Sequence, residues 1–158
     1  MPTLNKTAHE LLQSKRSEVS AVISVAPNDT VLSALTLMRD KNVGAVVVLD
    51  RGELKGILTE RDYARDVELE GKTAGACLVH EIMTDRSIVF ARPGDSVERC
   101  HALLKTHRIR HLLVCEERKV IGVLSVRDIL EEIIAEEKNV IRELETDRLM
   151  MTTDTGSY

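Results

Sequence analysis

Apolar positions along this chain follow two spacings that predict different elements. Val31, Ala34, Leu35 and Met38 occupy positions i, i+3, i+4 and i+7, which places them on one face of an amphipathic helix. Residues 43–49 form instead a continuous, valine-rich apolar run, which is typical of a strand buried on both faces. The two patterns together indicate a fold that mixes helices and strands.

Shorter signals complete this unit. Residues 22–25 predict a short strand before the helix, and residues 54–58 predict another strand after a turn at residues 50–53. Thr59 then opens a second helix, which ends near Gly71. The predicted order of elements is therefore β-α-β-β-α.

The unit occurs twice. Residues 27–31 return as 93–97, and residues 56–62 return as 122–128, so both segments are displaced by 66 positions (27 to 93 and 56 to 122). The second copy predicts a helix carrying Val97, Cys100 and Leu104, strands over 109–115 and 120–124, and a helix from Ser125. Two copies are too few, and too far apart, for a solenoid with repeats of roughly 20–50 residues. We therefore expect two similar halves packed about a pseudo-two-fold axis.

The predicted fold class is α/β in the broad sense that includes α+β, and the chain divides into five segments. These are an N-terminal helical extension (1–15, with a helix at 8–15), a first repeat (16–71), a linker with a break at Gly75 (72–80), a second repeat (81–136), and a C-terminal helix extension and tail (137–158). The last helix has a long apolar stripe, formed by Ile129, Leu130, Ile133, Ile134, Val140, Ile141 and Leu144. This stripe predicts packing either against a partner chain or back onto its own domain.

Composition excludes several functions. The 158 residues include 22 basic and 26 acidic side chains, and such a net acidic chain is poorly suited to wrapping nucleic acid. Aromatic residues are only 2% of the chain, which removes the stacking platform of single-strand binders. The three cysteines form no C-x-x-C pair, which indicates reduced, buried thiols. We see no signal-peptide pattern and no aliphatic stretch long enough to span a bilayer, so we expect a cytoplasmic protein with no membrane partner.

The candidate chemistry lies where a strand meets a helix in each copy, at Thr59-x-x-Asp62 and Ser125-x-x-Asp128. One interpretation is a capping box, in which a hydroxyl and an acid three residues later satisfy free N–H groups at a helix start. The other interpretation is a ligand site. Glu is the usual partner in a capping box, and the shorter Asp is less suited to reaching back and better suited to pointing outward.

Two further features favour the ligand site. Arg61 and Arg127 stand in the first turn of each helix, where a cation opposes the helix dipole, so an anion is expected nearby. Free N–H groups at a helix start also bind phosphate. A hydroxyl, a carboxylate and a guanidinium together match a ribose 5′-phosphate.

These residues resemble those of a tandem CBS domain pair over about residues 16–136. The signals are Ile82-Met83-Thr84 before the second copy, the helix starts at 29–31 and 95–97, and Gly-x-x-Thr/Ser-x-x-Asp closing each copy. The resemblance implies two β-α-β-β-α units joined through their sheets. It also implies two related clefts that bind AMP, ADP, ATP, NAD-type or S-adenosyl ligands.

The resemblance assigns a role to each site residue. Asp62 and Asp128 would contact ribose hydroxyls, Thr59 and Ser125 would lie beside the phosphate or ribose, and Arg61 and Arg127 would lie near the phosphates. The adenine would contact Ile23, Val43 and the Gly44 backbone in the Asp128 cleft, and Val89 and Ile109 in the Asp62 cleft, with Thr84 nearby. Arg110 and His111 stand where the family often places phosphate-contacting cations.

Plainer interpretations stay open for some of these positions. Ile23, Val43 and Ile109 also fit plain core packing, and Arg110 and His111 also fit a solvated strand end. The first copy has Gly44 and Ala45 where the second has Arg110 and His111, so the two clefts should not be equivalent.

The expected function is a regulatory sensor of adenosine nucleotides that catalyses no reaction. The five histidines show no metal-binding spacing, and we find no Gly-rich phosphate loop and no nucleophile signature, so we expect no metal site and no catalytic residues. The alternative is a dimerisation scaffold that regulates a partner enzyme or transporter with no ligand bound. In both cases we expect a homodimer, because the last helix carries the long stripe and CBS pairs associate edge to edge.

Overall fold

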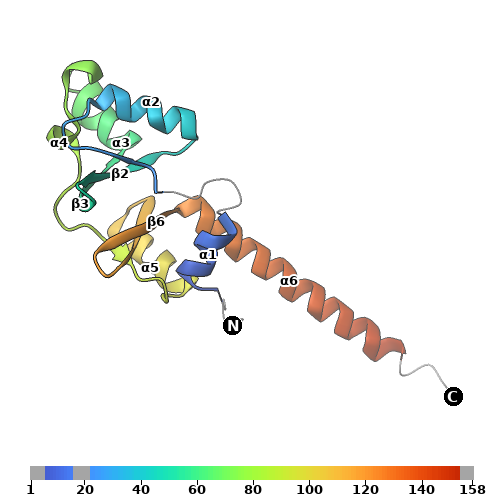
Figure 1. Cartoon of the computed structure of the whole chain (residues 1–158). Coiled ribbons are helices and arrows are strands. Elements are labelled where there is room, and N and C mark those ends of the chain that lie inside the picture. The colour runs from blue at the N-terminus through green and yellow to red at the C-terminus, as the bar shows by residue number, and fades with distance from the viewer. Residues whose placement is uncertain (1–5, 16–21, 154–158) are drawn as a thin grey trace.

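The computed structural model describes residues 6–15 and 22–153, which form two lobes and one projecting helix (Figure 1). The predicted pair of β-α-β-β-α units is confirmed. The first copy contains β1 (Ser24–Val25), α2 (Val31–Lys41), β2 (Ala45–Asp50), β3 (Glu53–Thr59) and α3 (Glu60–Tyr63), which continues as a π-helix (Ala64–Glu68). The second contains β4 (Phe90–Ala91), α5 (Val97–His107), β5 (His111–Glu116), β6 (Lys119–Ser125) and α6 (Val126–Thr153).

Each copy folds into its own three-stranded sheet, and the two sheets have the same topology. The strand orders are β1-β2-β3 and β4-β5-β6, in which the first pair is parallel and the second antiparallel. The register shifts after Val48 in one copy and after Val114 in the other, at equivalent positions of the duplication. Strands β3 and β6 lie against each other and join the two lobes.

The central strands are buried on both faces, as the valine-rich run predicts. Residues 45–48 of β2 and residues 112–114 of β5 are all buried. Both strands begin two residues later than predicted, at Ala45 and His111. The residues just before them therefore lie between helix and strand, at the border between the lobes.

The main helices begin and end through matching local interactions. Thr30 caps α2 by accepting a hydrogen bond from the Ser33 N–H, and Ser96 caps α5 in the same way. Each helix ends on a residue in the left-handed conformation, Asn42 at φ 53° and Arg108 at φ 53°. These ends turn the chain sharply into the central strand of each sheet.

The core of each lobe is completed by a segment from elsewhere in the chain. Helix α1 (Ala8–Lys15) packs on the second copy, where Ala8, Leu11 and Leu12 are buried in its core. Helix α4 (Val79–Ile82) packs on the first copy together with Cys77. The segment expected to be a linker (72–80) therefore contains Cys77 and the start of α4, as well as a 3-10 turn over 74–76.

Backbone hydrogen bonds show that these two segments are equivalent. The Ala8 N–H donates to the Asp95 carbonyl at 2.8 Å, and the Val79 N–H donates to the Asp29 carbonyl at 2.8 Å. Asp29 and Asp95 are themselves repeat equivalents, so the pseudo-two-fold relation extends to the helices outside the repeats. The repeat comparison missed this relation, because residues 8–11 (Ala-His-Glu-Leu) and residues 79–82 (Val-His-Glu-Ile) match at a displacement of 71 positions (8 to 79) rather than 66.

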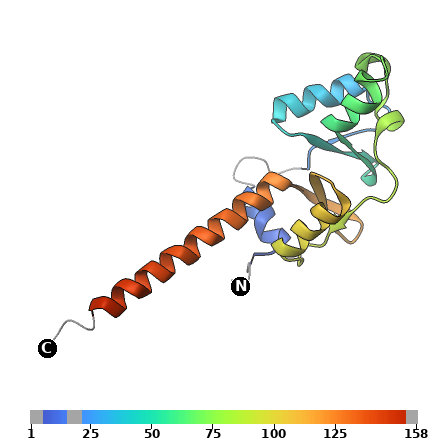
Figure 2. The same cartoon turned by 180° about the vertical axis from the view of Figure 1, so that it is seen from behind.

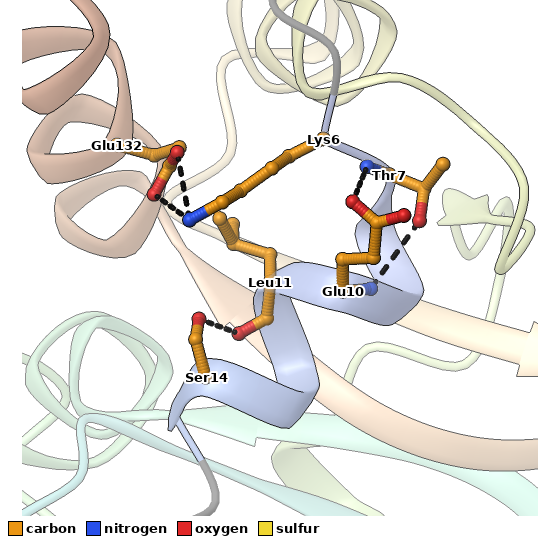
Figure 3. A network of polar contacts seen from close by, with 6 residues as sticks. All are labelled: Lys6, Thr7, Glu10, Leu11, Ser14 and Glu132. Atoms are coloured by element: carbon orange, nitrogen blue, oxygen red, sulfur yellow. Dashed lines mark hydrogen bonds and ion pairs between the residues drawn. The ribbon is translucent and has the colours of Figure 1, made fainter. Parts of the chain in front are cut away.

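A polar network fixes the N-terminal segment to α6 (Figure 3). The Lys6 Nζ lies 3.1 Å from Glu132 Oε1, whose side chain is largely covered. Thr7 and Glu10 form reciprocal hydrogen bonds at the start of α1, and the Ser14 hydroxyl donates to the Leu11 carbonyl. The network holds α1 between the second sheet and the last helix.

Helix α6 leaves the body after its first turns (Figures 1 and 2). Ile129 is fully buried and Ile133 packs against the core of the second copy, whereas residues 141–151 are all exposed. The stripe was predicted to pack either against a partner chain or back onto its own domain. Ile129 and Ile133 pack on their own domain, and the apolar residues from Ile141 onward do not. The helix continues to Thr153, so residues 152 and 153 belong to the helix and not to a frayed tail, and the remaining residues lie outside the described part of the chain.

Two glycines allow the exchanged segments to pass close to the sheets. A Cβ atom on Gly56 would lie 2.7 Å from the Thr84 carbonyl oxygen and 2.9 Å from the Met83 sulfur. A Cβ atom on Gly122, its repeat equivalent, would lie 2.5 Å from a Leu12 methyl carbon. Both contacts are closer than real Cβ atoms approach, so a side chain at either position forces the neighbour to move.

Replacing Gly56 by Ala should therefore lower the free energy of unfolding by about 1–3 kcal/mol, the usual cost of overpacking. The matched control is Gly94→Ala, because a Cβ on Gly94 meets nothing within 4 Å. Urea unfolding followed by circular dichroism measures both variants. Equal stability of the two would contradict the close approach.

Candidate functional site

Two cavities lie between the lobes, and each is lined by both copies. The larger, here called the Asp128 cleft, has a volume of about 670 Å³. The smaller, here called the Asp62 cleft, has a volume of about 480 Å³. The structure places every residue predicted for the Asp128 cleft around the first cavity, namely Ser125, Arg127, Asp128, Ile23, Val43 and Gly44. It places those predicted for the Asp62 cleft around the second, namely Thr59, Arg61, Asp62, Thr84, Val89 and Ile109.

Arg110 and His111 line both cavities, as does Gly44. A Cβ on Gly44 would lie 3.3 Å from two atoms of the His111 ring, so the imidazole packs directly over the glycine. Gly44 is the repeat equivalent of Arg110, and the residue after it, Ala45, is the repeat equivalent of His111. These positions of the two copies therefore meet near the pseudo-two-fold axis. They form a wall that the clefts share.

Both strand-to-helix junctions form a capping box. The Thr59 N–H donates to Asp62 Oδ2 at 2.9 Å, and the Asp62 N–H donates to Thr59 Oγ1 at 3.1 Å. Ser125 and Asp128 make the same pair of hydrogen bonds at 2.7 Å and 3.1 Å. The expectation that the shorter Asp is less suited to reach back is therefore wrong, because this helix start brings the carboxylate within hydrogen-bond distance of the cap N–H.

The capping box does not exclude a ligand role for these carboxylates. Each accepts the cap bond through Oδ2, whereas a carboxylate can accept about four hydrogen bonds through its two oxygens. Asp62 and Asp128 are half-buried and line their cavities. The same side chain can therefore cap the helix and accept hydrogen bonds from hydroxyl groups in the cleft.

The first-turn arginine of the second copy, Arg127, pairs with an acid of its own helix. The Arg127 Nε donates to Glu131 Oε1 at 3.0 Å, one turn along α6, and both side chains are mostly exposed. Such an exposed pair contributes little to stability, so it opposes a competing anion only weakly. Sequence analysis missed Glu131, although its i, i+4 spacing from Arg127 is a recognisable signal.

The Asp62 cleft is richer in cations than the Asp128 cleft. Besides Arg61 and Arg110 it is lined by Arg65 and Arg108, and its acids are Glu60 and Asp62. The Asp128 cleft is lined by Lys41, Arg110 and Arg127, with Asp128 and Glu131 as acids. The spacing of Arg65 from Arg61 could have indicated a shared helix face, but Arg108 reaches its cleft only because α5 ends there.

The apolar candidates serve the core and the clefts together. Ile23 and Val43 are half-buried against the core of the first copy, and Val89 and Ile109 against the core of the second. Each also lines a cavity, so both interpretations of these residues hold at once. Thr84 is exposed, and its backbone pairs with Ile57 of β3.

The cysteines are buried or half-buried thiols and do not belong to either cavity lining. Burial raises the pKa of the Cys100 thiol to about 11, which keeps it protonated and unreactive. Within residues 6–15 and 22–153, we find no group of three His, Cys, Asp or Glu side chains placed to hold a metal ion. No helix in the same ranges has the length and apolarity needed to cross a membrane.

The sequence and the structure both identify the family. The family model of the CBS domain matches residues 17–68 and 79–135, so the chain belongs to the CBS-domain family. It is a tandem CBS pair, a class of regulatory module that generally binds adenosine ligands.

Known proteins of the family are similar over most of the chain. The mitochondrial CBS domain-containing protein CBSX3 of Arabidopsis thaliana is 32% identical over 87% of this chain and 69% of its own length. The CBS domain-containing protein YhcV of Bacillus subtilis is 34% identical over 73% of this chain and 81% of its own. A solved CBS-domain structure from Burkholderia ambifaria has a TM-score of 0.78 and 38% identity, covering 82% of this chain and 95% of that one.

Burial of Asp62 predicts a pH dependence of stability. Desolvation raises the pKa of its carboxyl above the ordinary value, although the hydrogen bonds from Thr59 oppose this shift. Because this pKa is higher in the folded state than in the unfolded state, Asp62 adds to the free energy of unfolding at low pH. That contribution is lost as the pH rises through the pKa of the folded state.

Wild type should therefore gain free energy of unfolding relative to Asp62→Asn when the pH falls from neutral toward the ordinary pKa of Asp. Urea unfolding at several pH values measures the difference between the two proteins. Asp50→Asn, at an exposed site at the end of β2, serves as the control. A difference that stays constant or moves the other way would contradict the assigned cause.

Proposed function

We propose that this CBS pair is a non-catalytic sensor of adenosine nucleotides, such as AMP, ADP, ATP or NAD, that acts in the cytoplasm on a partner enzyme or transporter. One observation carries the proposal. In both copies, the hydroxyl, carboxylate and guanidinium of a strand-to-helix junction line one cavity together with apolar side chains of the other copy. A nucleoside phosphate needs this combination, because it joins a flat apolar base, a diol and an anion.

The polar end of each cleft fits the ribose and the phosphate. Asp62 and Asp128 offer carboxylate oxygens to the ribose hydroxyls, and Thr59 and Ser125 stand next to them at the helix start. Arg61 and Arg127 supply cations at the same helix turn, where a bound phosphate would offset their unfavourable position on the helix dipole. The same ligand would draw on Arg110 or His111 from the shared wall.

The apolar end of each cleft fits the adenine. Ile23 and Val43 border the Asp128 cleft, next to the backbone of Gly44, and Val89 and Ile109 border the Asp62 cleft, with Thr84 nearby. These side chains are held by the lobe cores, so little conformational freedom is lost when a base packs between them. Backbone groups beside them can select one base edge.

Regulation requires that occupancy of a cleft change the surface that a partner reads. Each cleft is bordered by both copies, and a nucleotide in either one would alter how the lobes sit against each other. The functional unit in this proposal is a homodimer, in which such a change can reach the second chain. A scaffold without ligand is the competing function, and the exposed stripe of α6 is the observation that favours it.

Titration calorimetry with adenosine and AMP separates the nucleotide site from a purely structural motif. Asp62→Ala or Asp128→Ala should weaken adenosine and AMP alike in that cleft, because both ligands carry the ribose. Arg61→Ala or Arg127→Ala should weaken AMP and leave adenosine nearly unchanged. Each lost charge-assisted hydrogen bond is worth about 1.5–3 kcal/mol, so the affected affinities should fall roughly tenfold to a hundredfold.

The capping box alone predicts a different result. Loss of the cap lowers stability by about 0.5–2 kcal/mol and leaves affinity unchanged while the protein stays folded. Melting curves of the four variants therefore accompany the titrations. Unchanged affinities in both Asp variants, or equal losses for both ligands in the Arg variants, would contradict the assigned roles.

The charge difference between the clefts predicts a difference in ligand. Four arginines line the Asp62 cleft, and each additional phosphate of a nucleotide adds negative charge that they can offset. Arg65→Ala should therefore lower the affinity for ATP by a larger factor than the affinity for AMP, as measured by calorimetry. Arg39→Ala on exposed α2, outside both cavity linings, is the control. Equal losses for the two ligands would show that Arg65 contacts no outer phosphate.

A further inference from the structure

The later turns of α6 project from the body (Figures 1 and 2), and their exposed side chains include an apolar stripe. Ile141, Leu144 and Met151 are 54%, 63% and 74% exposed, and Leu130 and Ile134 nearer the body are also exposed. Their spacing of three, four or seven positions places them on the same side of the helix. Large apolar side chains arranged in this way indicate a surface that another molecule covers.

The stripe follows a heptad pattern. Positions 130, 134, 137, 141, 144, 148 and 151 alternate steps of four and three, which is the spacing of the contact positions in a coiled coil. Five of the seven are apolar, and the other two are Glu137 and Arg148. A helix of this kind is marginally stable without tertiary contacts, so a partner helix would also explain its length.

We propose that α6 pairs with α6 of a second copy of this chain in an antiparallel coiled coil. This inference does not require that either cleft bind a nucleotide. It specifies the interface of the homodimer through residues that line neither cavity.

The two charged positions decide the orientation. In a parallel pair each contact residue faces its own counterpart, so Glu137 would meet Glu137 and Arg148 would meet Arg148 in the apolar seam. In an antiparallel pair with Ile141 opposite Leu144 of the second copy, Glu137 lies opposite Arg148. The opposite charges then meet twice, because the two-fold axis repeats each contact.

The remaining positions fit the same register. Ile134 lies opposite Met151 of the second copy, which keeps large apolar residues together along the seam. Lys138 and Glu145 stand on one flank of the stripe, and the antiparallel arrangement brings them near each other across the interface. A polar pair among apolar contacts is also the device by which coiled coils select one register.

The charge of α6 disfavours a membrane surface as the occupant. The helix carries eight acidic and four basic residues, whereas helices that lie on anionic membranes are rich in Lys and Arg. A second copy of α6 complements the stripe in both apolarity and charge order.

Sedimentation equilibrium of the full chain over a range of concentrations tests the pairing. Wild type should have twice the chain mass of 17.6 kDa, and Ile141→Asp should shift it to the monomer. Asn139→Asp introduces the same side chain on the opposite face of the helix and should leave the dimer intact. A monomeric wild type, or a dimer unaffected by Ile141→Asp, would overturn the proposal.

Charge reversal tests the orientation with variants that keep the helix. Glu137→Arg should weaken the dimer by about tenfold or more, because it places like charges opposite each other in the antiparallel pair. Adding Arg148→Glu should restore the affinity. A parallel pair predicts no loss from the single change, since Arg facing Arg replaces Glu facing Glu. That result would overturn the antiparallel arrangement, and circular dichroism confirms that each variant stays folded.

Discussion

The close approach of the exchanged segments to Gly56 and Gly122 is the constraint on which the rest of this structure depends. Because Gly56 has no side chain, Met83 and Thr84 lie directly on the first sheet. At the equivalent position of the second sheet, Gly122 allows Leu12 to do the same. Each segment can then complete the core of the lobe other than the one that it immediately precedes. The lobes are thereby tied together, and the clefts form along the border between them.

The same residues serve the fold and the candidate site at several points. The hydroxyl and carboxylate of each junction satisfy the helix N-terminus, and they also line a cavity. Ile23 and Ile109 support the lobe cores while forming the apolar end of a cleft. Because the site is built from structural residues, it is held in place before any ligand arrives, which reduces the cost of ordering it.

Duplication created two clefts, and later differences between the copies made them unequal. The His111 ring of the second copy packs over Gly44 of the first copy, where the absence of a side chain leaves room for it. The cations gather around the Asp62 cleft, partly because Arg108 ends α5 in a left-handed conformation at its border. Helix α6 differs most of all, since its first-copy equivalent ends by Glu68 whereas α6 continues to Thr153.

Local patterns in the sequence determined the elements, their order and the duplication. The amphipathic spacing from Val31 to Met38 and the valine-rich run after it depend only on neighbours in the chain, so they could be recognised without the fold. The motifs at Asp62 and Asp128, with the repeat, indicated the hydroxyl, carboxylate and guanidinium of each cleft, and the resemblance to CBS pairs supplied the apolar candidates. The stripe on α6 could be recognised in the same way, though not the direction in which the helix would leave the body.

Only the tertiary structure decided which segments complete which lobe and where the aspartate side chains lie. Helix α1 packs on the second copy because Leu12 fits the space over Gly122, a contact between residues far apart in sequence that no local pattern encodes. Asp62 and Asp128 reach back to the cap N–H because of the backbone path at the junction, which propensity alone does not specify. Arg65, Arg108 and Glu131 joined the clefts for the same reason, since membership of a cavity depends on how distant elements are placed in space.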